Sequence, residues 1–157
     1  MEECVKYYYK DKNAPSITEP IGLGVVAIIK YKNKYLLEKR SDCHKWGFIG
    51  GEVRIEEDII SALRREVFEE TRIEIDNYKI MGIFSNPGRR IQYLNGKVKR
   101  VVSIVFRVSI KSCKDIKISK ESEKLAFFTK KEIGDLEIVE THIPIYKALN
   151  KREITIE

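Results

Sequence analysis

The stretch GGEVRIEEDIISALRREVFEETRI, residues 50–73, decides the fold of this protein. Behind the glycine pair, apolar residues recur at the three- and four-residue spacing of an amphipathic helix. This periodicity predicts a helix from about Glu57 to Glu70, and its apolar residues are Ile59, Ile60, Leu63 and Val67. The glycines permit close backbone approach and a sharp turn before the helix.

One face of that helix carries more carboxylates than stability alone would select. Glu66, Glu69 and Glu70 stand at positions i, i+3 and i+4 and therefore project together. Like charges at this spacing destabilise a helix by about 0.2–0.5 kcal/mol per pair, and anions near a helix C-terminus also oppose its dipole. A divalent cation bound by oxygen ligands would reverse both penalties, and magnesium is the natural candidate. For the three glutamates taken alone, the alternative is a solvated acidic face neutralised by Arg64, Arg65 and Arg72.

The whole pattern resembles the signature of the Nudix family. That signature is Gly, five residues, Glu, seven residues, Arg-Glu, an aliphatic residue, any residue, Glu-Glu, any residue, Gly and an aliphatic residue. Its matching positions here are Gly51, Glu57, Arg65, Glu66, Val67, Glu69, Glu70 and Ile73. Arg72 replaces the last glycine, and we expect it to adopt the left-handed cap at a cost of about 1 kcal/mol, with the chemistry intact.

The resemblance covers roughly residues 18–150 and implies the α/β (α+β) class, with a Nudix-type α/β/α sandwich around a central mixed β-sheet. We divide the chain into an N-terminal arm with at most one short strand, residues 1–20, and one Nudix hydrolase domain, residues 21–157. The continuous apolar run Ile21–Ile29 predicts a strand buried on both faces. Further strands are expected at 34–38, within 73–84, and at 91–94, 99–110 and 125–128, and short helices at 130–136 and 141–151. Turns are expected at Lys32-Asn33 and Asn95-Gly96, and loops at 41–51 and 85–90.

Nudix enzymes hydrolyse a diphosphate linkage in a nucleoside diphosphate joined to another group. The resemblance implies that Glu66, Glu69, Glu70 and the carbonyl of Gly50 bind Mg²⁺, with Mn²⁺ as an alternative. It also implies catalytic or orienting roles for Glu66, Arg65 and Glu57. The metal would lower the pKa of a bound water and align it for attack on phosphorus, and a carboxylate such as Glu66 would accept the proton.

Candidate substrate-binding residues lie outside the signature. Arg89 and Arg90 are the first candidates for phosphate contacts, because arginine binds phosphate through a bidentate fork. The second strand ends in Lys39 and Arg40, and Arg40 is preferred for the same reason. The other residues considered are Glu121 and Glu123 as an added carboxylate, and Tyr7 to Tyr9, Phe48, Phe84, Tyr93 and Phe127 as stacking partners for a base. His44 and His142 are expected to be surface or cap residues.

Composition limits the remaining possibilities. The chain has 157 residues and a net charge of +6, which favours phosphate-rich partners without establishing nucleic-acid binding. No apolar run is long enough to cross a bilayer, and the N-terminus lacks a signal-peptide pattern, so we expect a cytoplasmic protein without membrane contact. The three cysteines show no metal-binding spacing, and we expect free thiols.

Several functions remain open. The substrate classes are nucleoside diphosphate sugars such as ADP-ribose, nucleoside triphosphates and dinucleotide polyphosphates. The alternatives are an RNA 5′-end pyrophosphohydrolase and a non-catalytic Nudix module that senses a nucleotide. No DNA partner is expected, and a homodimer is left open.

Overall fold

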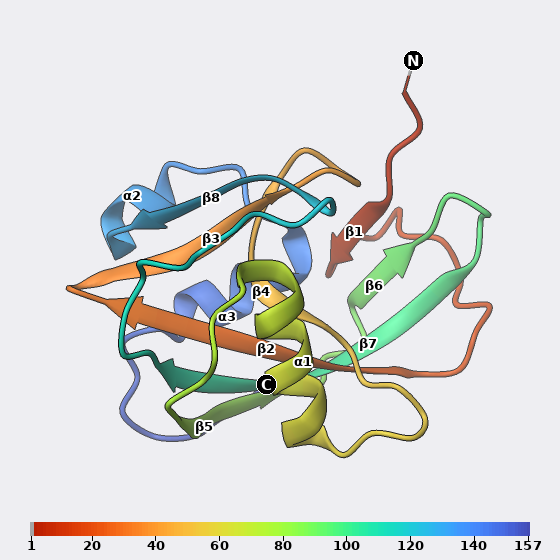
Figure 1. Cartoon of the computed structure of the whole chain (residues 1–157). Coiled ribbons are helices and arrows are strands. Elements are labelled where there is room, and N and C mark those ends of the chain that lie inside the picture. The colour runs from red at the N-terminus through yellow and green to blue at the C-terminus, as the bar shows by residue number, and fades with distance from the viewer. Residues whose placement is uncertain (1) are drawn as a thin grey trace.

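A computed structural model describes residues 2–157 of the chain (Figure 1). Its elements are β1 (Lys6–Tyr9), β2 (Gly22–Tyr31), β3 (Lys34–Arg40), β4 (Trp46–Glu52), α1 (Ile59–Thr71), β5 (Asn77–Phe84), β6 (Arg89–Gln92), β7 (Val98–Ser109), β8 (Ser122–Phe128), α2 (Lys130–Gly134), the 3₁₀ helix η1 (Glu140–His142), α3 (Ile143–Lys147) and β9 (Thr155–Ile156). Most strands and helices lie where the sequence predicts them. The predicted terminal helix is shorter than expected and is divided into η1 and α3.

The nine strands form one mixed sheet. Its main path runs β1-β6-β7-β2-β4-β3-β8, and β5 pairs with both β7 and β9. The central pair β2–β7 is parallel, as is β5–β9, and the remaining pairs are antiparallel. The predicted turn at Lys32 and Asn33 joins β2 to β3 with positive φ at both residues, 48° and 63°, as a tight hairpin requires.

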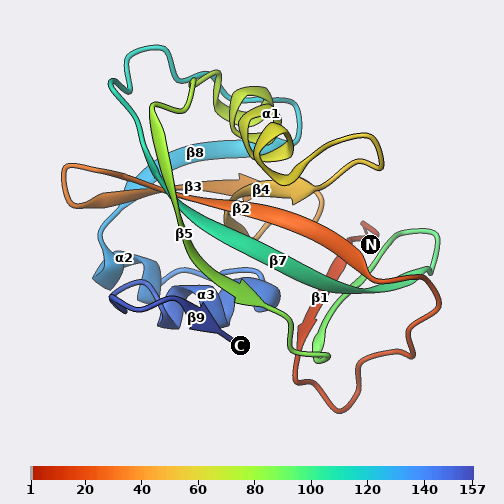
Figure 2. The ribbon, with the colours of Figure 1, turned by 90° about the horizontal axis from the view of Figure 1, so that it is seen from below.

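Strand β2 separates the core into two layers because its alternate side chains enter opposite faces of the sheet. Val25, Ala27 and Ile29 pack in the cluster that includes α1, whereas Val26 and Ile28 pack in the cluster that includes α3. Figure 2 shows α1 on one face and α2 and α3 on the other. The predicted α/β/α sandwich with a mixed central sheet is therefore confirmed.

The predicted loop at 41–51 is wrong for its second half, which forms β4 between β2 and β3. The glycine pair is extended rather than sharply turned, because neither Gly50 nor Gly51 has a positive φ. At Gly50 a Cβ would lie 2.2 Å from the carbonyl oxygen of Val25. These glycines therefore serve close strand approach, which lets β4 run directly under α1.

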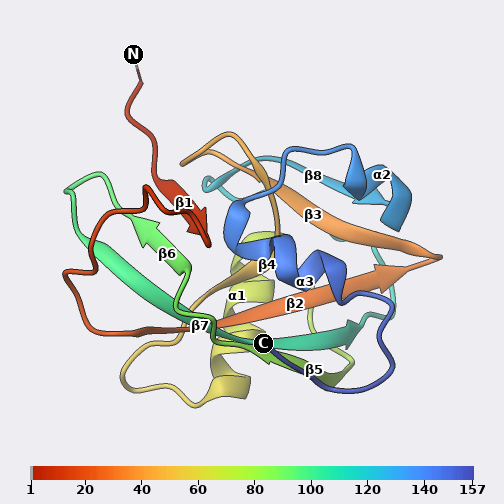
Figure 3. The ribbon, with the colours of Figure 1, turned by 180° about the vertical axis from the view of Figure 1, so that it is seen from behind.

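The N-terminal arm and the predicted hairpin together build one side wall of the molecule. Strand β1 pairs with β6, and β6 pairs with the first part of β7 through the turn at Gly96, where φ is 82°. Figure 3 shows the β1–β6 pair standing beside the central strands. Arg89 and Arg90 belong to β6, so the expectation that they stand in an exposed loop is wrong.

Candidate active site

Helix α1 is fixed at both ends by its own residues. The side chain of Asp58 caps the N-terminus and accepts the backbone N–H of Ser61 at 2.7 Å. At the C-terminus Arg72 adopts the left-handed conformation, with φ 64°, and its N–H donates to the carbonyl of Phe68. This is the cap expected of the residue that replaces the signature glycine, and it ends the helix just beyond Glu70.

Arg65 organises the outer carboxylates of the helix. Its Nε and Nη2 donate to the two oxygens of Glu57 at 2.6 and 2.8 Å, while Nη1 reaches Glu66 at 2.7 Å and Glu69 at 3.3 Å. The hydrogen bonds from Arg65 lower the pKa of Glu57 to about 2. Arg65 also donates to the carbonyl of Glu52 at the end of β4. The guanidinium therefore links the end of β4 to three of the four signature glutamates, Glu57, Glu66 and Glu69.

A buried pair of carboxyl groups lies beneath the helix, and sequence analysis identified only one of them. Glu70 is 3% exposed and Glu38, on β3, is 1% exposed. Burial, and then the neighbouring Glu38, raises the pKa of Glu70, and burial also raises the pKa of Glu38. Arg40 and Ser122 donate to Glu38, whereas Oε2 of Glu70 is sealed from solvent without a hydrogen-bond partner.

Glu66 lies against the backbone of β4. A Cβ at Gly51 would come within 2.4 Å of the Glu66 carboxylate, so glycine allows this carboxylate to lie where it does. Glu66 is 9% exposed, and burial raises its pKa despite the bond from Arg65. Gly51 thus allows the Glu66 carboxylate to lie directly against the backbone of β4.

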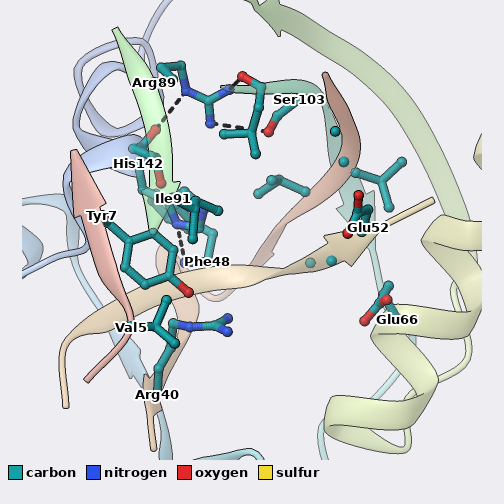
Figure 4. Close-up of a pocket in the computed structure, with 18 of the residues that line it drawn as sticks. Val5, Tyr7, Arg40, Phe48, Glu52, Glu66, Arg89, Ile91, Ser103 and His142 are labelled. Carbon is teal, nitrogen blue, oxygen red and sulfur yellow. Dashed lines mark hydrogen bonds between the residues drawn. The ribbon is translucent and has the colours of Figure 1, made fainter. Parts of the chain in front are cut away.

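These groups form one end of a cavity of about 430 Å³, drawn in Figure 4. The predicted site residues and stacking candidates that line the cavity are Gly50, Gly51, Glu66, Glu70, Arg40, Arg89, Glu121, Tyr7, Phe48 and Tyr93. Glu57, Arg65 and Glu69 lie beside it, joined to Glu66 through the guanidinium of Arg65. The structure therefore brings most of the predicted residues to one place, although it assigns no role to any of them.

The predicted phosphate-binding arginines are largely engaged within the protein. Arg89 is 1% exposed, and its guanidinium donates to the carbonyls of Phe84, Val101 and Thr141 and to Ser103 Oγ at 2.8–3.1 Å. Burial lowers the pKa of Arg89 to about 10. This side chain lies in the cavity wall and joins β5, β6, β7 and η1.

Arg90 and Arg40 have different surroundings. Arg90 donates to the carbonyls of Pro15 and Pro87 and does not line the cavity. Arg40 does line it, but its guanidinium makes a two-point contact with Asp42, at 2.8 and 3.0 Å, and a third bond to Glu38. Its charge is therefore already compensated by two carboxylates.

Of the two glutamates considered as an added carboxylate, only one lines the cavity. Glu121 lines the cavity, whereas Glu123 pairs with Lys39 at 3.7 Å and with His44. His44 is a surface residue, as predicted. No disulfide joins the cysteines among residues 2–157, and Cys4, Cys43 and Cys113 are free.

The far end of the cavity contains Tyr7, a predicted stacking candidate, and His142, which was predicted to lie elsewhere. Tyr7 on β1 extends into it, and its hydroxyl donates to Asp42 at 3.1 Å. His142, expected to be a surface or cap residue, lies in the wall instead, and its Nδ1 accepts the backbone N–H of Phe48 at 3.1 Å. Figure 4 shows Tyr7, Arg89 and His142 on one side of the cavity and Glu52 and Glu66 on the other. No local motif marks these residues, because they come from strands and turns far apart in the chain.

Comparisons with known proteins agree with this geometry. The model of the NUDIX domain family matches residues 19–149. Similar solved structures include the MutT protein from Bacillus halodurans, with 23% identity, a TM-score of 0.69 and 86% of each chain covered. The MutT protein from Methanosarcina mazei Go1 has 26% identity and a TM-score of 0.65, with 87% of this chain and 100% of that chain covered.

A third similar structure is a bifunctional NMN adenylyltransferase/ADP ribose pyrophosphatase from Francisella tularensis, complexed with AMP and a Mn ion. Its identity is 22% and its TM-score 0.65, with 85% of this chain covered but only 42% of that chain. A comparison with curated protein sequences found no match. None of the helices in residues 2–157 has the length and apolar character that a membrane crossing requires.

The fold, the signature helix and the family match lead to one conclusion. The chain belongs to the Nudix family, and it is a hydrolase that acts on phosphoric anhydrides. Nudix enzymes bind nucleotide substrates and generally use divalent metals.

The residues present fit such a metal in their chemistry. In residues 2–157, no three His, Cys, Asp or Glu side chains converge as a ready-made ion site, because Arg65 holds Glu66 and Glu69. However, the sealed Glu70 oxygen lacks any partner, and burial raises the pKa of both Glu66 and Glu70. Hard oxygen donors with excess negative charge are the set that Mg²⁺ and Mn²⁺ prefer.

Proposed function

We propose that this hydrolase is a magnesium-dependent pyrophosphohydrolase that cleaves the diphosphate linkage of a nucleoside diphosphate joined to another group. Nucleoside diphosphate sugars such as ADP-ribose and nucleoside triphosphates are the substrate classes we favour. We also propose a cytoplasmic location, and the existence of a homodimer stays an open prediction.

A single observation carries this proposal: one cavity contains both kinds of surface that such a substrate needs. Glu66 and Glu70 stand at one end, next to the β4 backbone. Tyr7 supplies an aromatic ring at the other end, beside the buried ring of Phe48, and hydrogen-bonding groups lie nearby. A volume of about 430 Å³ is within the range of small-molecule sites, and a nucleotide placed there would present its phosphates to the carboxylates.

The roles of the chain's own residues follow from their contacts. Glu66, Glu69, Glu70 and the carbonyl of Gly50 would hold Mg²⁺. When bound, the metal supplies charge neutralisation for phosphate oxygens and an acidified water. Arg65 keeps Glu66 and Glu69 oriented and is itself fixed by Glu57. Glu66 would accept the proton from the water that attacks phosphorus.

Of the three arginines that the sequence suggested for phosphate binding, we propose only Arg40. Arg40 faces the cavity and offers one edge to substrate, with Asp42 and Glu38 fixing its position. Arg89 is committed to four protein acceptors, so we propose a structural role for it. Arg90 lies outside the cavity, and we do not propose it as a ligand.

Two alternatives remain distinguishable. A non-catalytic module that senses nucleotides would be favoured by loss of a signature carboxylate, and all four glutamates are present. An RNA 5′-end pyrophosphohydrolase is compatible with the net charge of +6 and differs in the size of its substrate.

The test is a hydrolysis screen with Mg²⁺, and in parallel with Mn²⁺. It includes ADP-ribose, other nucleoside diphosphate sugars, nucleoside triphosphates, dinucleotide polyphosphates and 5′-triphosphorylated RNA, with products separated by chromatography. We expect nucleoside monophosphate release that stops with EDTA and in Glu66→Gln. If nucleotides bind but none is cleaved with either metal, the sensing module replaces the enzyme.

A further inference from the structure

The far end of the cavity presents an unusual histidine. His142 follows directly after Thr141, whose carbonyl accepts a hydrogen bond from Arg89 at 3.1 Å. Its ring lies 5.8 Å from the ring of Phe48, and a Cβ at Gly47 would approach its Nδ1 to 3.3 Å. The imidazole is therefore held from both the η1 side and the β4 side.

These contacts fix which nitrogen carries the proton. Nδ1 accepts the N–H of Phe48, so in the neutral ring the proton must sit on Nε2. Burial, and then the charges of Arg89 and Arg40, lowers the pKa of His142 to about 3, which keeps the ring neutral near pH 7. His142 is thus a fixed neutral donor.

That donor is available to a ligand. In residues 2–157, Nε2 makes no hydrogen bond, and it is not among the sealed, unpartnered polar atoms, which are Glu70 Oε2, Arg100 Nε, Glu140 Oε2 and Glu157 Oε2. His142 lines the cavity, so a ligand bound there would lie beside this ring.

The neighbouring polar groups also favour an acceptor on the ligand. Ser103 Oγ accepts from Arg89, so its hydroxyl hydrogen is free to donate into the cavity. Gly24 leaves this hydroxyl uncovered, since a Cβ there would lie 3.5 Å from it. The Asp42 carboxylate, an acceptor nearby, is already occupied by Arg40 and Tyr7. Tyr7 adds a flat apolar surface suited to a planar ring.

We propose that His142 is a specificity-determining residue, whose Nε2–H selects nucleobases with a ring carbonyl oxygen over those with an exocyclic amino group. This rests on the proposed function, because it assumes that the base occupies the far end. An amino group at the same place would set two donors against each other and leave both unpaired, which a buried site disfavours strongly.

The test uses matched product nucleotides and binding calorimetry of the full chain, so that no turnover is needed. Inosine 5′-monophosphate has a ring carbonyl where adenosine 5′-monophosphate has an amino group. Uridine and cytidine 5′-monophosphates differ in the same way. We expect the carbonyl member of at least one pair to bind at least about tenfold more tightly. In His142→Phe, which keeps a ring but removes the donor, the preference should disappear, whereas His142→Gln, which retains a donor and an acceptor, should keep part of it.

Each outcome decides the matter. Equal affinities within both pairs in the wild type, or an undiminished preference in His142→Phe, would overturn the assignment while leaving the enzyme class intact. Complete absence of nucleotide binding, with Mg²⁺ present, would instead contradict the proposed function, and this inference with it.

Discussion

The two ends of the cavity differ in how their buried ionisable groups are hydrogen-bonded. At the α1 end, Glu66, Glu70 and Glu38 bring buried carboxyl groups together, burial raises the pKa of each, and one buried oxygen of Glu70 has no partner. At the far end, the buried Arg89 is matched by four acceptors, and His142 is neutral. The acidic end is therefore where we propose that a cation binds, whereas the guanidinium of Arg89 at the far end is satisfied by acceptors within the fold.

The largest effect should come from removing one charge at the acidic end. Glu70→Gln keeps the shape of the side chain and eliminates a carboxylate that we propose binds the metal, so catalysis should fall by at least about a hundredfold. Glu74→Gln, an exposed glutamate beyond the helix, is the matched control and should retain wild-type turnover. Steady-state kinetics on the substrate found in the screen measure both, and unchanged turnover in Glu70→Gln would remove it from the metal site.

The far end should respond to mutation through stability. Arg89→Met leaves the carbonyls of Phe84, Val101 and Thr141 without their donor, and we expect a loss of about 2–4 kcal/mol in the free energy of unfolding. Arg90→Ala, next to it on the outer side, should cost less than about 1 kcal/mol. Urea unfolding gives both values. A wild-type midpoint for Arg89→Met would show that this arginine is not the structural link we describe.

The same end should make the protein sensitive to acid. The pKa of His142 is about 3 in the folded chain, below its ordinary value of 6.5, so between these values the unfolded chain binds a proton that the folded chain does not. The contribution of the neutral His142 to the free energy of unfolding is therefore complete above pH 6.5 and is lost as the pH falls towards 3. Between about pH 7 and about pH 5 the wild type should lose up to about 2 kcal/mol more than His142→Gln. Parallel stability curves for the two proteins would contradict the neutral, buried histidine.

The smallest effect concerns the helix that carries the acidic end. Arg72→Gly relieves a left-handed non-glycine residue, which should stabilise the protein by a few tenths to about 1 kcal/mol. The gain is limited because Arg72 lies over the ring of Phe68 at 5.4 Å and favours the helix dipole. Catalysis should be nearly unchanged. A clear drop in the denaturant midpoint would mean that the contact with Phe68 outweighs the backbone strain.

The contrast between the two ends also explains what the sequence can reveal. The acidic end comes from one continuous stretch, so helical spacing alone is enough to place Glu66, Glu69 and Glu70 on one face. The cap at Arg72 and the link between Glu57 and Arg65 follow from the same local pattern. Even Glu38 carried a signal, since it is a charged residue in the otherwise apolar strand segment YLLE.

The far end could not be predicted in this way. Tyr7, Arg89 and His142 are brought together by the pairing of β1 with β6 and by the turn of η1 against β4. Such long-range pairings leave no periodic trace in the chain. The same phosphate-binding role was expected for Arg89 and Arg90 because both are arginines. Alternate side chains of a strand face opposite sides, so Arg89 lies in the core and Arg90 points outward.

The most direct test of this account is the melting temperature of the wild type and Glu70→Gln, with and without Mn²⁺ or Mg²⁺ and in the absence of substrate. Without metal, Glu70→Gln should melt at or above the wild-type temperature, because burial and the neighbouring Glu38 disfavour an ionised Glu70 and raise its pKa, whereas the amide of glutamine is neutral at every pH. Metal should raise the melting temperature of the wild type in a concentration-dependent way and leave Glu70→Gln nearly unchanged. A wild type that ignores millimolar metal, or a Glu70→Gln variant that is clearly less stable without metal, would contradict the claim that the acidic end awaits a cation.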